Sequence, residues 1–489
     1  MKRKLLILLL WAGSAASGAA QDMKKIRVAC VGNSITAGAG LKDPAHMAYP
    51  GRLQAMMGEG YEVLNFGVSG ATLLHKGNQP YWQSKAYRNA LDSKPDVVFI
   101  KLGTNDSKGV NRPVLDHLGA DADELVRAFK SLPTHPRVVL LLPIAVFKKD
   151  TAGIYDPVIV QRIIPQLEEA AYRDSVEVVD LHSLFMDKAA MLHDGVHPDT
   201  AGASAIATRL AQVLRQDTSD RFNIWQHLDQ TLSPQLSSFY GYTCASFTFE
   251  GHSCKIVQPK HAAKGHPWVW RARFWGHEPQ ADIDLLQRGF HVVYCDVAEL
   301  YGNAESIRAW NDFYVLVHGA GLSAKAAMEG MSRGGVYVYN WAVENPGKVA
   351  CVYADNPVLD LKSWPGARGK GPGSKSDWEK VRKDFSLRTA EDETVFAQSP
   401  IDKVAQIVKG GYPMLHLLAD ADEVVPPGEN TIPFERQVKA LGGNITVYHK
   451  PGFGHHPHSL PDPAVIVDFI TRYAGDGALH ATTSSTPAR

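Results

Sequence analysis

Short apolar runs alternate with amphipathic stretches along almost the whole chain, and this alternation limits the folds available to it. In the first part, the apolar runs lie at residues 26–31, 62–66, 96–102, 137–143 and 176–181. Strands that alternate with helices usually pair in parallel, and the helices cover both faces of the sheet. We therefore expect an α/β fold built on a parallel sheet in this part.

The chain is long enough for two such units, since 489 residues exceed what one hydrophobic core usually organises. A polar joint at residues 217–220 is followed by a hairpin pattern, with two runs that meet at Glu250-Gly251. Further apolar runs follow at residues 267–270, 289–295, 326–329, 415–418 and 447–450. We predict two three-layer α/β/α sandwiches, at residues 24–215 and 222–474, the second with a mostly parallel sheet.

Both ends of the chain lie outside these units. Residues 1–20 have a basic start, an apolar run at 5–11 and then small residues, which is typical of a cleavable signal peptide. The apolar run is far shorter than the roughly 20 residues that span a bilayer. We therefore expect export to the periplasm or beyond, without a membrane anchor. Residues 475–489, rich in Ala, Thr and Ser, predict a disordered tail.

Charge and cysteine content exclude several classes of protein. The 51 basic residues balance the 51 acidic ones, which makes a nucleic acid an unfavourable partner. Five scattered cysteines are too few for a disulfide framework or a zinc motif, although Cys244 and Cys254 are candidates to pair across the hairpin. The sequence predicts no metal and no cofactor, and it leaves the oligomeric state open.

Polar residues and glycines with catalytic potential follow the strands of the first part. Ser34 follows the first strand, Gly70 the second and Asn105 the third, while Asp194 and His197 follow the fifth. The carboxyl ends of parallel strands meet at one edge of a sheet, so we expect these groups to converge. We interpret Ser34, Asp194 and His197 as nucleophile, orienting acid and base, and Gly70 and Asn105 as oxyanion donors.

The motifs around these residues are Gly-Asn-Ser-Ile-Thr at 32–36, Asn-Phe-Gly-Val-Ser-Gly at 65–70, Gly-Thr-Asn-Asp at 103–106 and Asp-Gly-Val-His-Pro at 194–198. Residues 26–214 thereby resemble the SGNH (GDSL-like) hydrolases, although Asn33 stands where many members carry Asp. The resemblance implies a flavodoxin-like sheet and a serine-esterase mechanism. Members often remove acetyl groups from sugars, and others are lipases or thioesterases, so we expect an O-acetylesterase.

A second serine lies in Gly-Met-Ser332-Arg-Gly, between a predicted strand at 326–329 and a predicted helix at 337–344. In that context Gly-x-Ser-x-Gly indicates a nucleophile elbow, and an acid and then a histidine should follow along the chain. Asp422 and His455 follow the next strands in that order. Asp420 remains the alternative acid, and His456 and His458 remain the alternative bases.

Residues 240–473 resemble the α/β-hydrolase superfamily, particularly its prolyl-oligopeptidase-like and glycan-esterase branches. The resemblance implies Ser332 as nucleophile, Asp422 as acid and His455 as base. Arg333 would give its backbone N–H to the oxyanion hole and add a charged donor. Glucuronoyl esterases are similar in having arginine directly after the serine.

Four further residues of this half are candidates for binding substrate. The second oxyanion N–H should come from the loop at 271–275, where Arg271 and Arg273 can bind a carboxylate or form surface salt bridges. Trp275 and Trp364 are candidates to stack on sugar rings. We assign substrate selection to residues 361–411, which interrupt the strand pattern.

Together these features predict an exported serine esterase with two active sites, which deacylates plant polysaccharide. The first site would remove acetyl groups, and the second an acetyl or a uronate methyl ester, as in pectin. Alternatively, the C-terminal domain is a non-catalytic glycan-binding module or a peptidase. Neither esterase reaction needs a metal.

Overall fold

The computed structural model describes residues 24–475, so the predicted signal peptide and all but the first residue of the predicted tail lie outside it. The first sheet has five parallel strands in the order β2-β1-β3-β4-β5. They are β1 (Ile26–Gly32), β2 (Tyr61–Gly67), β3 (Val97–Lys101), β4 (Arg137–Leu141) and β5 (Glu177–Val179). This is the parallel sheet that the sequence predicts, and each strand lies where an apolar run predicts it.

Alternate residues of these strands enter two different cores, as the twofold period of a strand requires. Val28, Cys30 and Phe99 pack on one face with residues of α3 and α9, whereas Val31 and Ile100 pack on the other with residues of α5 and α7. The helices are α1 (Ser34–Ala37), α2 (Pro44–Met47), α3 (Tyr49–Met57), α4 (Lys85–Asp92), α5 (Leu118–Lys130), α6 (Asp156–Val158), α7 (Ile164–Arg173), α8 (Leu181–Phe185) and α9 (Thr200–Arg215).

The second sheet has nine strands in the order β14-β13-β12-β11-β9-β10-β8-β7-β6. Neighbours from β14 to β10 run parallel, and β10, β8, β7 and β6 pair antiparallel. The strands are β6 (Gln235–Phe239), β7 (Tyr242–Phe249), β8 (His252–Gln258), β9 (Trp268–Ala272), β10 (His291–Cys295), β11 (Ala326–Met331), β12 (Val349–Asp355), β13 (Met414–Ala419) and β14 (Ile445–Lys450). The mostly parallel sheet and the hairpin are confirmed.

Helices cover both faces of this sheet as well. Residues of α10 and α17 pack on one face, and residues of α11, α12, α15 and α16 pack on the other. The helices are α10 (Gln280–Gln287), α11 (Ala304–Gly319), α12 (Gly334–Glu344), α13 (Lys375–Asp384), α14 (Ala390–Val395), α15 (Val404–Lys409), α16 (Thr431–Ala440) and α17 (Ala464–Ala474). The predicted fold class, two three-layer α/β/α sandwiches, is confirmed. None of the helices between residues 24 and 475 has the length and hydropathy to cross a bilayer.

The cysteine pairing suggested for the hairpin is wrong. The strand register places Cys244 opposite Val257 and Cys254 opposite Phe247, so the two thiols do not face each other. Cys254 instead lies opposite Cys295 of β10. All five cysteines fall within the described residues, and each is a buried free thiol.

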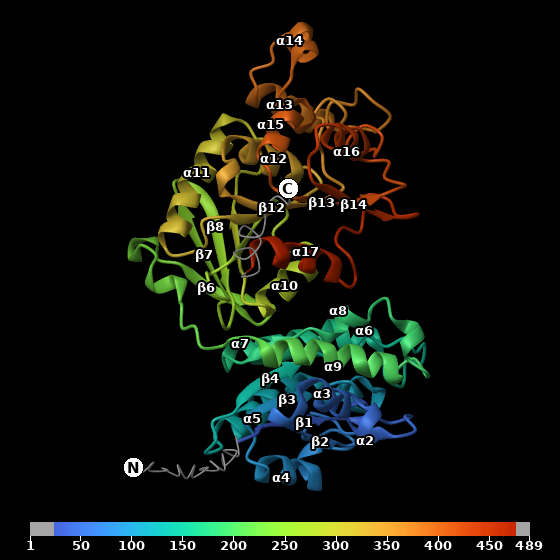
Figure 1. Cartoon of the computed structure of the whole chain (residues 1–489). Coiled ribbons are helices and arrows are strands. Elements are labelled where there is room, and N and C mark those ends of the chain that lie inside the picture. Colours follow the sequence, from blue (N-terminus) through green and yellow to red (C-terminus); the bar gives the residue numbers. More distant parts are fainter. Residues whose placement is uncertain (1–23, 476–489) are drawn as a thin grey trace, which may run out of the picture.

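The two domains are stacked along the long axis of the molecule, with α7 and α9 of the first facing the second (Figure 1). Their contact includes apolar packing, because Val178 of β5 shares one core with Tyr242, Val257 and Leu286 of the second domain. The Tyr242 hydroxyl also donates to the Val178 carbonyl at 3.3 Å. The domains therefore share a core and are more than two units joined by a linker.

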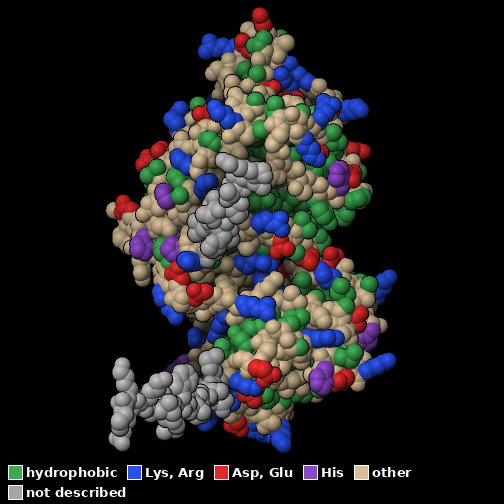
Figure 2. All heavy atoms as spheres, in the orientation of Figure 1, with side chains coloured by type: hydrophobic (Ala, Val, Ile, Leu, Met, Phe, Trp, Pro, Cys, Tyr) green, Lys and Arg blue, Asp and Glu red, His purple; other side chains and the backbone are tan. Residues whose placement is uncertain are grey.

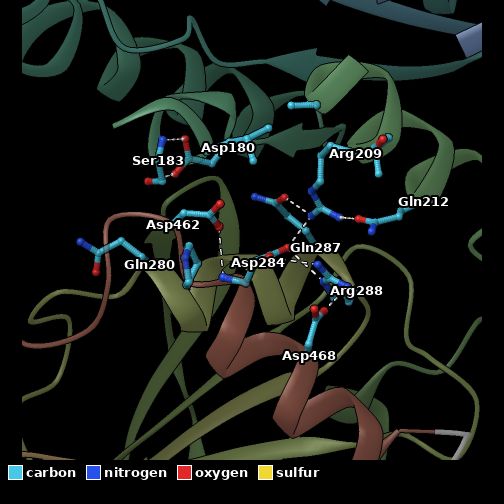
Figure 3. Close-up of a pocket in the computed structure, with 15 residues that line it drawn as sticks. Asp180, Ser183, Arg209, Gln212, Gln280, Asp284, Gln287, Arg288, Asp462 and Asp468 are labelled. Atoms are coloured by element: carbon cyan, nitrogen blue, oxygen red, sulfur yellow. Dashed lines mark hydrogen bonds and ion pairs between the residues drawn. The ribbon is translucent and has the colours of Figure 1, made fainter. Parts of the chain in front are cut away.

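Polar contacts surround this shared core. Figure 2 shows both basic and acidic side chains at the waist between the domains. Figure 3 shows one cavity there, of about 260 Å³, where Arg209 of α9 reaches Asp284 and Gln287 of α10. The Arg209 guanidinium lies 2.6 Å from Asp284, and Lys188 lies 2.6 Å from Asp462. Each of these ion pairs joins a residue of the first domain to a residue of the second, so the cavity is part of the domain interface.

Candidate active sites

Ser34 begins α1 directly after β1, at the carboxyl edge of the first sheet. The side chain of Asn33 caps this turn by accepting the Ile35 N–H at 3.1 Å, which fixes the backbone on both sides of the serine. Because Asn33 accepts this bond through its amide oxygen, it caps the helix as an aspartate would. Ser34 is nearly buried at this edge, with 8% of the residue exposed.

His197 and Asp194 complete a hydrogen-bonded relay with Ser34. The Ser34 Oγ lies 2.9 Å from His197 Nε2, and His197 Nδ1 lies 2.8 Å from Asp194 Oδ2. With Nδ1 donating to the carboxylate, Nε2 is free to accept the serine proton. The relay joins groups 163 residues apart in the sequence.

The turn that carries Asp194 also stabilises its charge. The second carboxylate oxygen accepts the backbone N–H groups of Val196 at 2.9 Å and His197 at 2.8 Å. Burial alone would raise the pKa of Asp194, but these donors and the His197 ring outweigh it and hold the pKa well below its usual value. Gly195 supplies the positive φ, +77°, at the centre of this turn.

Gly70 and Asn105 come to the same edge from the loops after β2 and β3. Gly70 has a φ of +82°, and a Cβ there would lie 2.3 Å from the Gln79 amide oxygen. Asn105 is 2% exposed and donates one amide hydrogen to the Ala71 carbonyl at 3.0 Å. Its other amide hydrogen remains for an oxyanion.

Asp106 is a positioning residue that the sequence interpretation missed. Its carboxylate accepts the backbone N–H groups of Leu73 at 3.1 Å and Leu74 at 2.9 Å, and so ties the loop that carries Gly70 to the loop that carries Asn105. Complete burial raises its pKa to about 6, against the lowering effect of those donors. The Gly-Thr-Asn-Asp motif contained this signal, but only the Asn was assigned a role.

Ser332 lies in a sharp turn between β11 and α12, with a strained φ of +49°. The turn is too tight for side chains at its glycines. A Cβ on Gly330 would lie 2.9 Å from the Gly334 carbonyl carbon, and one on Gly334 would lie 2.7 Å from the Ala272 oxygen. This strand, turn and helix is the geometry of a nucleophile elbow.

The structure brings His455 and Asp422 to this serine. Ser332 Oγ lies 2.9 Å from His455 Nε2, and His455 Nδ1 lies 2.7 Å from Asp422 Oδ2. The other Asp422 oxygen accepts the backbone N–H groups of Val424 and Val425, both at 2.9 Å. The second relay therefore has the same chemistry as the first.

Two of the three alternatives left open by the sequence, Asp420 and His458, have other partners in the structure, and the ring of the third, His456, lies 5.0 Å from that of His455. Asp420 lies 2.7 Å from His449 on the exposed side of the strand. His458 lies 3.2 Å from the buried Asp355, which also binds Lys450 at 3.1 Å. These contacts hold the loop that carries the catalytic imidazole without reaching Ser332.

Asn356 is a second positioning residue that the sequence interpretation missed. Its amide donates to the His455 carbonyl at 3.1 Å and accepts the Ala419 N–H at 2.7 Å. Asn356 has a φ of +43°, which asparagine tolerates better than most residues. It therefore ties the histidine loop to the end of β13.

Arg333 lies beside Ser332 and is held in a defined position. Its guanidinium lies 3.1 Å from Asp377 and 3.2 Å from the Tyr301 hydroxyl. Its carbon lies 5.7 Å from the centre of the Phe274 ring and 5.3 Å from that of Trp364. Asp377 belongs to α13, within residues 361–411, so this segment reaches the neighbour of the nucleophile.

Arg271 does not occupy the position predicted for it. The residue is 1% exposed, and its guanidinium lies 2.5 Å from Asp282 and 3.1 Å from Glu329. It also donates to the Phe274 carbonyl at 3.1 Å. The expectation that Arg271 binds substrate or lies at the surface is therefore corrected, because its donors are used inside the core.

The other three candidates for substrate binding, Arg273, Trp275 and Trp364, make contacts within the protein. Arg273 lies 3.3 Å from Glu299, which is half exposed. Trp275 packs against Phe239 and Tyr294, with ring centres 5.0 and 5.6 Å away. Trp364 is 8% exposed, and Arg333 lies over its ring. Trp364 is therefore not the open platform that the sequence suggested, whereas Trp275 is partly exposed.

Three clusters in the described part of the chain have ligand atoms close enough to share a metal ion, all within 4.8 Å of one another. They are His193 with Asp194 and His197, His455 with His456 and His458, and His277 with Glu278 and His456. The first two include a relay imidazole. A metal bound through Nε2 of that imidazole would displace its serine.

Comparison with known proteins agrees with the geometry of the first site. Residues 30–205 match the model of the GDSL-like Lipase/Acylhydrolase family. A protein named acetylxylan esterase from Xylanibacter ruminicola is 39% identical over 208 residues, which are 39% of this chain and 43% of the relative. The chain thus spans less than half of that relative's length.

Solved structures are similar to parts of this chain. A carbohydrate acetylesterase family member from Sinorhizobium meliloti is 19% identical, with a TM-score of 0.32 over 39% of this chain and 98% of its own. A puromycin-hydrolyzing peptidase from Mycobacterium tuberculosis is 13% identical, with a TM-score of 0.38 over 50% of this chain and 39% of its own.

Proposed function

Because residues 30–205 form a GDSL-like hydrolase domain, we propose that the chain is an exported serine esterase with two active sites, which deacylates plant polysaccharide. The first site is an O-acetylesterase. The observation that carries the proposal is the presence of two complete serine, histidine and aspartate relays, with Ser34 and Ser332 each 2.9 Å from its own imidazole. The relative named acetylxylan esterase supports an acetylated glycan as substrate of the first site.

Each site has the groups for acyl transfer through a covalent intermediate. The histidine takes the serine proton as the hydroxyl attacks the ester carbonyl, and the aspartate stabilises the imidazolium that forms. At the first site, Gly70 N–H and the free Asn105 hydrogen stabilise the oxyanion. The histidine then protonates the leaving alkoxide, which departs as a sugar hydroxyl from an acetyl ester or as methanol from a methyl ester. Water, activated by the same histidine, then hydrolyses the acyl-enzyme and releases the acid.

The second site acts on a neutral glycan ester, either an acetyl group or a uronate methyl ester, as in pectin. Arg333 is paired with Asp377, so the position next to Ser332 offers directed N–H donors without a full uncompensated charge. A neutral ester suits that environment better than a free carboxylate. The complete relay at Ser332 favours catalysis over a purely glycan-binding role for this domain.

The test is the release of acetate and methanol from acetylated xylan and from esterified pectin. Ser34→Ala and Ser332→Ala should each lower the rate of a different activity by a factor on the order of 10⁶. The double variant should have neither activity. Asp420→Asn is the matched control for Asp422→Asn, because Asp422 contacts the catalytic His455 whereas Asp420 contacts His449. Loss of every activity from one serine substitution would refute the division of labour.

A further inference from the structure

A groove between the domains lies far from both relays. Its volume is about 460 Å³, within the range of small-ligand sites, about 300–1,000 Å³. It is formed where the amino ends of β4 and β5 meet the hairpin of β7 and β8 and the segment that joins the domains. Since the strands are parallel, this edge of the first sheet is opposite to the edge that carries Ser34.

The groove is strongly basic. Lys130, Arg137, Arg221 and Lys260 line it, against one carboxylate, Glu177. Both oxygens of that carboxylate bind Arg137, at 2.6 Å each, and one lies 3.2 Å from His261. Burial would raise the pKa of Glu177, but these partners lower it to about 2. Glu177 therefore compensates Arg137 and leaves the other three cations.

Lys130, Arg221 and Lys260 have no carboxylate within 4.0 Å among residues 24–475. Lys260 is only partly exposed, and its ammonium lies 5.9 Å from the centre of the Tyr242 ring. Its burial, together with repulsion from Lys130, lowers its pKa to about 8, although Glu177 acts in the opposite direction. A partly buried ammonium group without an ion pair favours the approach of an anion.

The end of α7 accounts for only part of this charge. Lys130 donates to the Asp174 carbonyl at 2.7 Å, and Lys260 donates to the Ala171 carbonyl at 3.3 Å. A helix C-terminus is equivalent to about half a negative charge, whereas the two ammonium groups carry two positive charges. Each ammonium group also keeps two N–H donors that these carbonyls do not use.

We propose that this groove is an accessory site for the carboxylate of an acidic oligosaccharide, a uronate-bearing segment of the polysaccharide. The choice of a glycan rests on the proposed function, whereas the requirement for an anion rests on the charge of the groove. Ser175, Thr243 and Gln258 also line it and offer hydroxyl and amide groups to sugar hydroxyls. A polymer held there remains bound while its ester groups reach the two catalytic edges.

The experiment measures binding of trigalacturonate and of its carboxyl-reduced, neutral counterpart by calorimetry. The protein is the full chain with Ser34→Ala and Ser332→Ala, so that binding is measured whether or not the proposed esterase activities exist. Trigalacturonate should bind, and its affinity should fall at high salt. The neutral counterpart should bind at least about tenfold more weakly than trigalacturonate. Equal affinity for the two sugars would overturn the proposal.

Substitutions in the same background place the site. The double substitution Lys130→Gln and Lys260→Gln should weaken the binding of trigalacturonate at least about tenfold, because each substitution removes a charged donor. Lys260→Arg keeps the charge and should keep binding, and Lys409→Gln, an exposed lysine of α15, should have no effect. Unchanged affinity in the double lysine variant would overturn the site. Displacement of the sugar by an equal concentration of sulfate would overturn the uronate assignment.

Discussion

Replacement of Arg271 by methionine should destabilise the second domain strongly. The side chains of Arg271, Asp282 and Glu329 are 2%, 0% and 1% exposed. Burial and the neighbouring Asp282 raise the pKa of Glu329, so the guanidinium chiefly balances the charge of Asp282. Methionine would fill the volume of the aliphatic stem but leave that carboxylate buried and unpaired.

Loss of one partner from a buried ion pair costs about 3–5 kcal/mol. For a domain of this size, each kcal/mol lowers the melting temperature by roughly 2–4 °C, so Arg271→Met should lower it by roughly 6–20 °C. Most of the ten tryptophans lie after residue 222, so tryptophan fluorescence during heating reports this domain.

Arg273→Met is the matched control, because Arg273 pairs with Glu299, whose side chain is 51% exposed. That pair should contribute only about 0–1 kcal/mol. If both variants melt within a few degrees of the wild type, the assignment of Arg271 to the core is refuted. A loss of pectin binding by Arg271→Met without loss of stability would restore the original sequence interpretation.

Three further outcomes follow from the first domain. Asp194→Asn should lower acetate release at the first site by a factor on the order of 10³–10⁴, with turnover at Ser332 unchanged, as measured by separate assays in a Ser332→Ala and a Ser34→Ala background. Gly70→Ala should lower the same activity about 10²–10³-fold, since a residue with a Cβ is strained at the φ of +82° and the backbone that carries the oxyanion donor would have to shift. Circular dichroism would exclude unfolding as the cause. Glu177, whose pKa falls from 4.5 to about 2 on folding, should contribute about 3 kcal/mol of stability, fully present above pH 4.5 and lost as the pH falls towards 2. Urea unfolding of Glu177→Gln across this range should show a flatter pH dependence than the wild type, and an identical dependence would contradict the role of its pairing with Arg137.

Most strands were predictable because period and composition determine them locally, although β6 and β12 of the second sheet were not predicted. The five apolar runs of the first part each became a strand, and the serine turns followed from the strand, turn and helix order around Ser34 and Ser332. Parallel topology then brings the carboxyl ends together, which is why candidates as distant as Ser34 and His197 were found from the sequence.

Side-chain partners outside the motifs were not predictable, because they depend on tertiary packing. Arg271 precedes a loop and has the composition of a ligand-binding residue, but its strand is buried on both faces and carries the side chain into the core. The pairing predicted for Cys244 and Cys254 was wrong for a related reason. The cysteine opposite Cys254 is Cys295 of β10, 41 residues away, and only the strand register shows this neighbour. Asp377 and Asn356 likewise act through contacts that no local pattern encodes.

The central claim is that one chain carries two independent activated serines. Intact-mass measurement after reaction with a fluorophosphonate, followed by peptide mapping, tests it directly. We predict two labels per chain, at Ser34 and Ser332, with His197→Ala removing only the first and His455→Ala only the second. A single label per chain, or two labels that survive both histidine substitutions, would contradict the account.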